Sequence, residues 1–385
     1  MNPKGKPPRL RLLRWLRQIF FDDAATLLAV VQRWCKEGNN ALSQLIHSFG
    51  DRHQNSSKNP GILALLVNTL MSTITPLHQI DLHSGHLTKP SWSGNGRFLA
   101  IPTQSGSIGI FDLDTGQVTH TVGSHSGGVT AATWDRKAEF ILTGSLDRSV
   151  GLWEVSTGRR ASLPVSGHKE PVHSIEWTDE EALAMTCSRD RIRILDGACL
   201  HTGWTEEIED AINNKSTGFV AASCSHRTTF LLAALGENGG RLVLANALSA
   251  DVLDTVRMSE PARCVAWSPE EELVAVGAGR SIFVFRAAHD GFAGSARELT
   301  KDAPQVFAVA FSGDGTILAS ADAQGLKFWD LKNGRMIAVL NEKNEGLSGR
   351  YPPAGMAFHP AKPLLAVVTP AGDAFRILDL SSLER

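Results

Sequence analysis

Closely spaced cysteine pairs are missing from this chain. Its five cysteines are widely separated, and none belongs to a Cys-x-x-Cys pair. They are Cys35, Cys187, Cys199, Cys224 and Cys264. The odd number and the wide spacing argue against a disulfide framework and against a zinc site. We therefore expect a protein of a reducing compartment, the cytoplasm, that holds no metal.

Long apolar runs and an excess of one charge are missing as well. The longest run, residues 62–71, is about half of the roughly 18 residues that span a bilayer. Arginines interrupt the only early apolar stretch, which argues against a secretory signal. The formal net charge is −2, so the chain as a whole does not attract nucleic acid, and we expect no specific nucleic-acid partner.

The chain does contain an internal repeat. Seven short apolar strands each end at an anchor residue, and successive anchors are 42 to 47 residues apart. The anchors are Trp92, Trp134, Trp177, Cys224, Trp267, Phe311 and Phe358. Each is followed by a turn, a second apolar strand, a tight turn and a third strand. Apolar and β-branched runs between turn formers predict buried strands. A fourth, variable strand fits residues 160–165 and 335–340.

Units of this length, whose third strands end in LWE, ILD or FWD, resemble the WD40-repeat family. The resemblance implies an all-β fold, a seven-bladed β-propeller over residues 76–385. Members of this family commonly use an N-terminal strand as the outermost strand of the last blade. Residues 76–82, PLHQIDL, fit that role and would close the ring.

One region brings together a histidine, a hydroxyl and a carboxylate, as a hydrolase does. The residues are His125, Thr143 and Asp147, and Trp153 follows in the third strand. In WD40 repeats these four positions form a structural hydrogen-bond network. The carboxylate accepts hydrogen bonds from the imidazole and from turn amides, and the indole N–H binds the hydroxyl.

The next unit repeats most of this set. It contains His168, Thr186 and Asp190, but Leu195 replaces the tryptophan. A catalytic group is usually unique, and the chain has no Gly-x-Ser-x-Gly motif. We therefore interpret both sets as structural and predict a protein that is not an enzyme and needs no cofactor.

Two connections between units are longer than the others, and both should lie on one face of the propeller. Residues 205–217 are acidic, and residues 341–355 hold the only tyrosine. Loops commonly carry recognition, although a solvated loop without a role is the alternative. The candidate partner-binding residues in these loops are Glu206, Glu207, Arg350 and Tyr351.

Residues 1–75 differ from the repeats and predict a small α-helical N-terminal extension with a linker. Residues 9–21 have helical periodicity, with Trp15 on the apolar face. Arg11, Arg14 and Arg17 lie on the opposite face. This helix has several candidate roles: packing on its neighbours or the propeller, docking in a partner's groove, lying on an anionic membrane surface, or serving as a transit peptide.

We therefore expect a protein–protein interaction scaffold that its basic helix anchors to an assembly. One alternative is a peripheral membrane-associated propeller with a regulatory or sensor role. Another is a propeller enzyme with a site at the central channel.

Overall fold

The chain forms two compact units, Met1–Thr73 and Ile74–Arg385, and the second is the one described here. The computed structural model describes residues 76–81, 88–161, 167–177, 183–196, 204–207, 218–225, 230–235, 240–246, 249, 251–270, 272–288, 290–300, 304–341, 355–368 and 374–383. The predicted helical extension, residues 1–75, lies outside these ranges.

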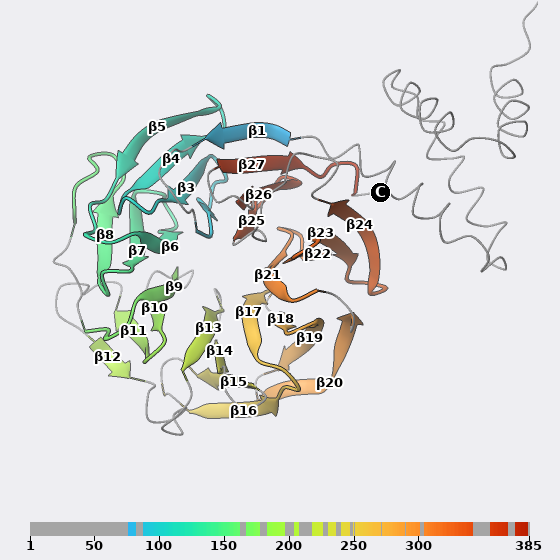
Figure 1. Ribbon diagram of the computed structural model, residues 1–385. Coiled ribbons are helices and arrows are strands. Elements are labelled where there is room, and N and C mark those ends of the chain that lie inside the picture. Colours follow the sequence, from blue (N-terminus) through green and yellow to red (C-terminus); the bar gives the residue numbers. More distant parts are fainter. Residues whose placement is uncertain are drawn as a thin grey trace, which may run out of the picture. The chain divides into compact units, whose positions relative to one another are not determined.

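Seven antiparallel sheets stand around a common axis and form a seven-bladed propeller (Figure 1). We number the blades 1 to 7 along the chain from β2. Blades 1 to 3 contain β2 (Ser91–Trp92), β3 (Phe98–Pro102), β4 (Ile108–Asp112) and β5 (Gln117–Val122); β6 (Val129–Trp134), β7 (Phe140–Ser145) and β8 (Val150–Glu154); and β9 (Val172–Trp177), β10 (Leu183–Ser188), β11 (Ile192–Asp196) and β12 (Trp204–Glu207).

The remaining blades follow the same order from the axis outward. Blades 4 to 7 contain β13 (Phe219–Cys224), β14 (Phe230–Leu235), β15 (Arg241–Asn246) and β16 (Val252–Arg257); β17 (Ala262–Trp267), β18 (Leu273–Ala278), β19 (Ser281–Ala288) and β20 (Gly291–Thr300); β21 (Val306–Phe311), β22 (Ile317–Asp322), β23 (Gly325–Asp330) and β24 (Arg335–Asn341); and β25 (Met356–Phe358), β26 (Leu364–Val368), β27 (Ala374–Asp379) and β1 (Pro76–Asp81).

The burial of the strands explains their composition. Every residue of β4, β22 and β26 is buried, because neighbouring blades cover both faces of these middle strands. Such strands consist of continuous apolar runs. The outer strand β16 has no fully buried residue, and its sequence mixes polar and apolar side chains. The apolar cores therefore lie between blades.

The ring closes through its two ends. β1 pairs antiparallel with β27, so the start of the repeat region supplies the outermost strand of blade 7 (Figure 1). It covers residues 76–81 of the expected segment, and residue 82 lies outside the described ranges. The ring of His78 on β1 meets that of Phe111 in blade 1 edge-on, with centroids 5.4 Å apart. The closing strand thus joins the last blade and also contacts the first.

One expectation about an outer strand needs correction. The first residues of the loop predicted at 205–217 lie instead in β12, where Glu206 and Glu207 pair with Ile194 and Arg193 of β11. The backbone edge of β11 requires a partner, and the WTEE segment supplies it. In blade 2 only residues 160 and 161 of the expected strand 160–165 lie within the described ranges; Arg160 forms a bridge with Trp153, and the Ala161 amide donates to the carbonyl of Leu152.

Candidate functional site

The four residues predicted to form a network in blade 2 do come together. The imidazole of His125 lies between Asp147 and Thr143: Nδ1 is 3.0 Å from a carboxylate oxygen of Asp147, and Nε2 is 2.8 Å from the hydroxyl of Thr143. The indole N–H of Trp153 donates to the same hydroxyl oxygen at 2.7 Å. The turn amides of Ser126 and Ser149 also donate to Asp147, at 3.0 and 2.9 Å.

The charges in this network are fixed by burial and hydrogen bonding. Burial lowers the pKa of His125, and the nearby charge of Asp147 only partly opposes this effect. Burial also raises the pKa of Asp147, but hydrogen bonds from Ser149 and the interaction with His125 outweigh it and hold that pKa well below its usual range. A neutral imidazole beside a carboxylate donates from Nδ1 and accepts the Thr143 hydroxyl at Nε2.

These hydrogen bonds connect the residues as in a hydrolytic triad, but the hydroxyl that would act as the nucleophile is not exposed to solvent. Thr143 and the His125 side chain are both 0% exposed. The Thr143 oxygen already accepts from Trp153, and a peptide carbonyl has no path to it in this state. A nucleophile must reach the reacting carbon, so the geometry favours a structural role for the set.

The corresponding set in blade 3 is connected differently. Nε2 of His168 lies 3.0 Å from the Thr186 hydroxyl, as in blade 2. Nδ1, however, lies 2.6 Å from the hydroxyl of Ser188, and Ser188 in turn donates to Asp190 at 2.6 Å. Asp190 forms an ion pair with Arg191 at 2.9 Å. The carboxylate is therefore linked to the histidine through a serine.

Blade 3 also contains a buried arginine that the sequence reading missed. Arg193 is 6% exposed and pairs with Thr186, just as Gly151 pairs with Thr143 in blade 2. Burial, followed by the positive charge of Arg193, lowers the pKa of His168 to about 4. Arginine alternating with isoleucine in this strand resembles a solvated face, so the signal in the sequence pointed the wrong way.

The anchor tryptophans have a role that the repeat alone did not reveal. Trp134 donates its indole N–H to the carbonyl of Ser91 at 2.9 Å, and Trp92 donates to Ala357 at 3.1 Å. Trp267 donates to Ser223 at 3.2 Å. Each acceptor directly precedes the anchor residue of the preceding blade. The recurrence of tryptophan at the end of the inner strands was the available signal for this link between blades.

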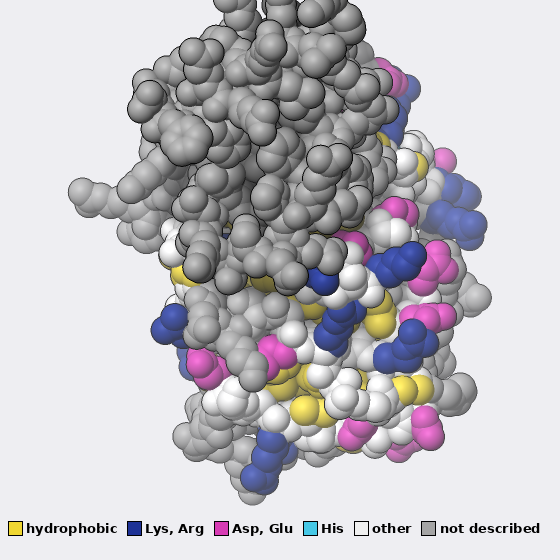
Figure 2. Space-filling model, turned by 90° about the vertical axis from the view of Figure 1, so that its right-hand side faces the viewer, with side chains coloured by type: hydrophobic (Ala, Val, Ile, Leu, Met, Phe, Trp, Pro, Cys, Tyr) yellow, Lys and Arg dark blue, Asp and Glu magenta, His cyan; other side chains and the backbone are white. Residues whose placement is uncertain are grey.

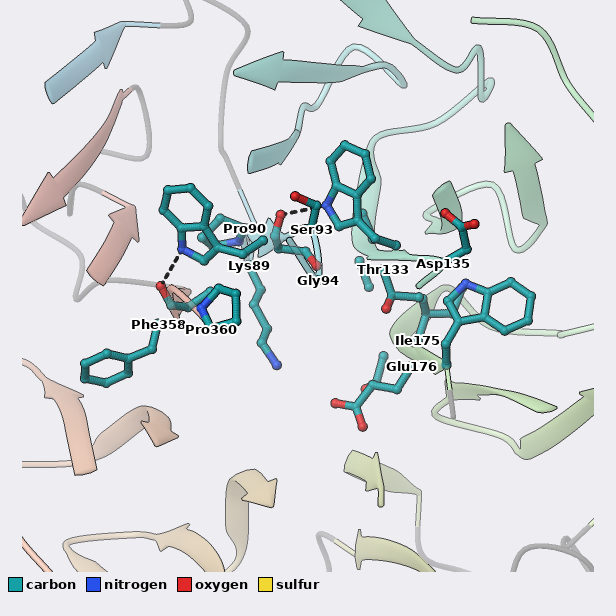
Figure 3. A pocket seen from close by; sticks show the side chains of 18 of the residues that line it. Lys89, Pro90, Ser93, Gly94, Thr133, Asp135, Ile175, Glu176, Phe358 and Pro360 are labelled. Atoms are coloured by element: carbon teal, nitrogen blue, oxygen red, sulfur yellow. Dashed lines mark hydrogen bonds between the residues drawn. The ribbon is translucent and has the colours of Figure 1, made fainter. Parts of the chain in front are cut away.

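The axis of the ring contains a cavity of about 350 Å³. We call it the axial cavity; the inner strands and following turns of blades 7, 1, 2 and 3 line it. The side chains of Lys89 and Glu176 point into the middle of the ring from different blades (Figure 3). Oε2 of Glu176 accepts hydrogen bonds from the Ser223 hydroxyl at 2.8 Å and from the Cys224 amide at 2.7 Å. Blade 3 is thereby tied to blade 4.

The other candidate residues fall into two groups. Glu206 and Glu207 lie on β12, away from the residues of the axial cavity in the strand order of blade 3. Six candidates lie outside the described residues: Arg11, Arg14, Trp15, Arg17, Arg350 and Tyr351. Within the described ranges, no three His, Cys, Asp or Glu side chains are grouped as metal ligands. None of the described segments forms a helix long and apolar enough to cross a membrane.

Comparisons with known proteins agree with this architecture. Residues 77–137 match the family model of the anaphase-promoting complex subunit 4 WD40 domain, and residues 296–330 match that of the WD domain, G-beta repeat. No curated protein sequence matches significantly. Among solved structures, the β-propeller domain of Cps50 (Swd1) from Myceliophteria thermophila is similar, with 20% identity and a TM-score of 0.67. The match covers 80% of this chain and 100% of that domain.

The sheets, their order and this structural match define a seven-bladed β-propeller. The two matching family models and the recurring third-strand endings indicate a propeller of the WD40 type. Two segments of the chain, residues 77–137 and 296–330, thus match WD40 models, and the chain as a whole is similar to WD40-repeat β-propellers.

Proposed function

We propose that this protein is a non-enzymatic, cytoplasmic scaffold that binds other proteins through its propeller. The observation that carries the proposal is the burial of Thr143 within the His125 network, since the triad-like set of blade 2 has no accessible nucleophile. WD40 propellers are typically interaction scaffolds. One of the matching family models is named for a subunit of a multi-subunit complex, which is consistent with an assembly component.

The surface charge supports proteins rather than nucleic acid as partners. On the side of the molecule in Figure 2, basic and acidic side chains are interspersed, and the described residues there form no broad area of one sign. A surface that binds nucleic acid nonspecifically is usually a continuous basic area. The three cysteines in the described part of the chain form no disulfide, which is consistent with a reducing compartment.

We further propose that residues 1–75 form a helical extension and that the basic helix at 9–21 anchors the propeller to its assembly. The support is the sequence pattern: arginines on one helical face and Trp15 on the other. Arg350 and Tyr351 remain candidate contacts on the propeller, because arginine and tyrosine are frequent hot-spot residues.

Affinity purification tests this function. The full chain, a chain lacking residues 1–60, and an Arg11/Arg14/Arg17→Glu variant would be purified from the same cells, with Lys332→Met as a surface control. We expect one set of proteins to be recovered with the full chain and the control, and lost or reduced with the other two. Identical partners in all four samples would refute the anchor. Absence of any specific partner, with flotation of the full chain on phosphatidylserine vesicles, would favour the membrane-associated alternative.

A further inference from the structure

Four charged residues line the axial cavity: Asp135 and Arg136 in the turn after β6, and Lys89 and Glu176, which are opposite in sign and do not neutralise each other. Lys89 is exposed, and within the described residues it makes no side-chain hydrogen bond or ion pair. Glu176 is half-buried and also has no ion pair among these residues. In Figure 3 both point toward the middle of the ring, from blades 1 and 3. A cation and an anion therefore face the same space from separate walls.

The carboxylate is held in place, whereas the ammonium can adjust. Both protein hydrogen bonds of Glu176 are received by Oε2, from Ser223 and Cys224. Oε1 accepts no hydrogen bond from the part of the chain that the structure describes. A carboxylate with one oxygen fixed and the other open is preorganised to accept from a ligand, because little order is lost on binding. Lys89 has a long flexible stem that can follow a ligand's anionic group.

The size and lining of the cavity fit a small polar molecule. Its volume of about 350 Å³ lies at the lower end of the range found for ligand pockets. Hydroxyl side chains line it at Ser91, Thr133 and Ser174, and apolar walls are provided by residues such as Ile175 and Ala357. Ligand pockets usually have apolar walls and a few polar groups that converge on the ligand.

We propose that the axial cavity binds a zwitterionic ligand, a free amino acid or a short peptide. Its ammonium group donates to Oε1 of Glu176, and its carboxylate is neutralised by Lys89. A ligand with only a cationic group would be repelled by Lys89, and one with only an anionic group by Glu176. A ligand that carries both charges can pair with Glu176 and with Lys89 at the same time. This inference goes beyond the scaffold function and does not depend on the N-terminal anchor.

Calorimetric titration of the full-length purified chain tests the proposal. The probes are zwitterions of increasing charge separation: glycine, 4-aminobutyrate, glycylglycine and triglycine. Acetate and propylamine, which carry a single charge, are the matched controls. We expect saturable binding of at least one zwitterion and none of either control. Lys89→Met and Glu176→Gln should each weaken that binding about tenfold or more, because each removes a charge-assisted contact.

Lys332→Met, on an exposed turn of blade 6, serves as the control variant and should bind like the unmodified chain. Glu176→Gln also alters the contact with blade 4, so the melting temperature of each unliganded variant is measured first. Lys89 makes no such contact, and its variant decides the question if Glu176→Gln unfolds. Absence of binding by every zwitterion, or equal binding by Lys89→Met, would overturn the proposal. Absence of any specific partner in affinity purification of the full chain would refute the scaffold and leave this result untouched.

Discussion

Blades 2 and 3 fill equivalent positions with different chemistry. In blade 2 the indole of Trp153 lies over Gly151, where an added Cβ would come within 2.8 Å of the indole nitrogen. In blade 3 the smaller Leu195 takes the place of the tryptophan, and Arg193 takes the place of the glycine. Leu195 and Arg193 are 2% and 6% exposed. We infer that the arginine side chain occupies volume that the indole fills in blade 2.

The difference shows what the two networks contribute. Blade 2 uses a neutral chain of donors and acceptors that ends on a carboxylate, with the guanidinium of Arg160 4.2 Å above the Trp153 ring. Blade 3 keeps a cation inside, next to a histidine whose pKa falls to about 4. Burial of His168, followed by the positive charge of Arg193, makes blade 3 the pH-sensitive member of the pair.

The largest effect should come from giving blade 2 only one of the two residues that distinguish blade 3, the leucine without the arginine. Trp153→Leu removes a side chain that is 2% exposed and leaves no arginine to fill the space. It also removes the donor to Thr143. We expect the free energy of unfolding to fall by about 3 kcal/mol, in the range for truncation of large aromatic residues. Urea unfolding measures it. A loss below that of a typical surface substitution would show that blade 2 does not depend on the indole.

A second test compares the two carboxylates. Asp147→Ala removes the acceptor for His125 and for two turn amides, so stability should fall by roughly 2–3 kcal/mol. Asp190→Ala should cost less, because the His168 ring is bonded to Ser188 and the turn amides of Lys169 and Glu170 donate to Asp190 at the longer distances of 3.2 and 3.3 Å. Thermal melting of both variants checks the order. The reverse order would mean that the Asp190–Arg191 pair stabilises more than the blade 2 network.

The pH dependence of stability should come mainly from blade 3. The pKa of His168 is about 4 in the folded protein and 6.5 in a model peptide, so the unfolded chain binds more protons between these values. Its contribution is complete above pH 6.5 and is lost as pH falls toward 4. At pH 5 the loss is about 2 kcal/mol.

Urea unfolding from pH 7 to pH 4.5 measures this loss, and His168→Asn should flatten the curve. His125→Asn should flatten it less, because Asp147 opposes the lowering of the His125 pKa. An unchanged slope in His168→Asn would exclude this histidine as the titrating group.

Much of the architecture was accessible from the sequence, because each blade repeats the same local pattern. The anchors and apolar runs predicted seven sheets and their strand order, and the spacing of His125, Thr143, Asp147 and Trp153 predicted which side chains meet. What escaped prediction depends on neighbours far apart in the chain. The carbonyl that accepts from Trp134 belongs to another blade, and the axial cavity is lined by four blades.

Other misses have local causes. The outer strands β5, β16 and β20 carry few buried residues, and the sequence of β12, WTEE, has too weak an apolar pattern to be separated from the residues after it. Arg193 alternates with isoleucines and therefore looked solvated, although the volume freed by Leu195 lets it be buried. In both cases the structure depends on the neighbouring residues or strand, which the local sequence pattern does not show.

The smallest predicted effect sharpens the comparison most directly, because it exchanges the two solutions. Leu195→Trp alone should destabilise blade 3, since the new indole meets Arg193, and Arg193→Gly alone should leave a void. Together they reproduce the Trp153–Gly151 arrangement, so the double variant should lose less stability than the sum of the single losses. We expect a favourable coupling of about 1 kcal/mol in a double-mutant cycle of urea unfolding. Strictly additive losses would mean that the arginine does not stand in for the indole, and that each blade packs its network independently of this exchange.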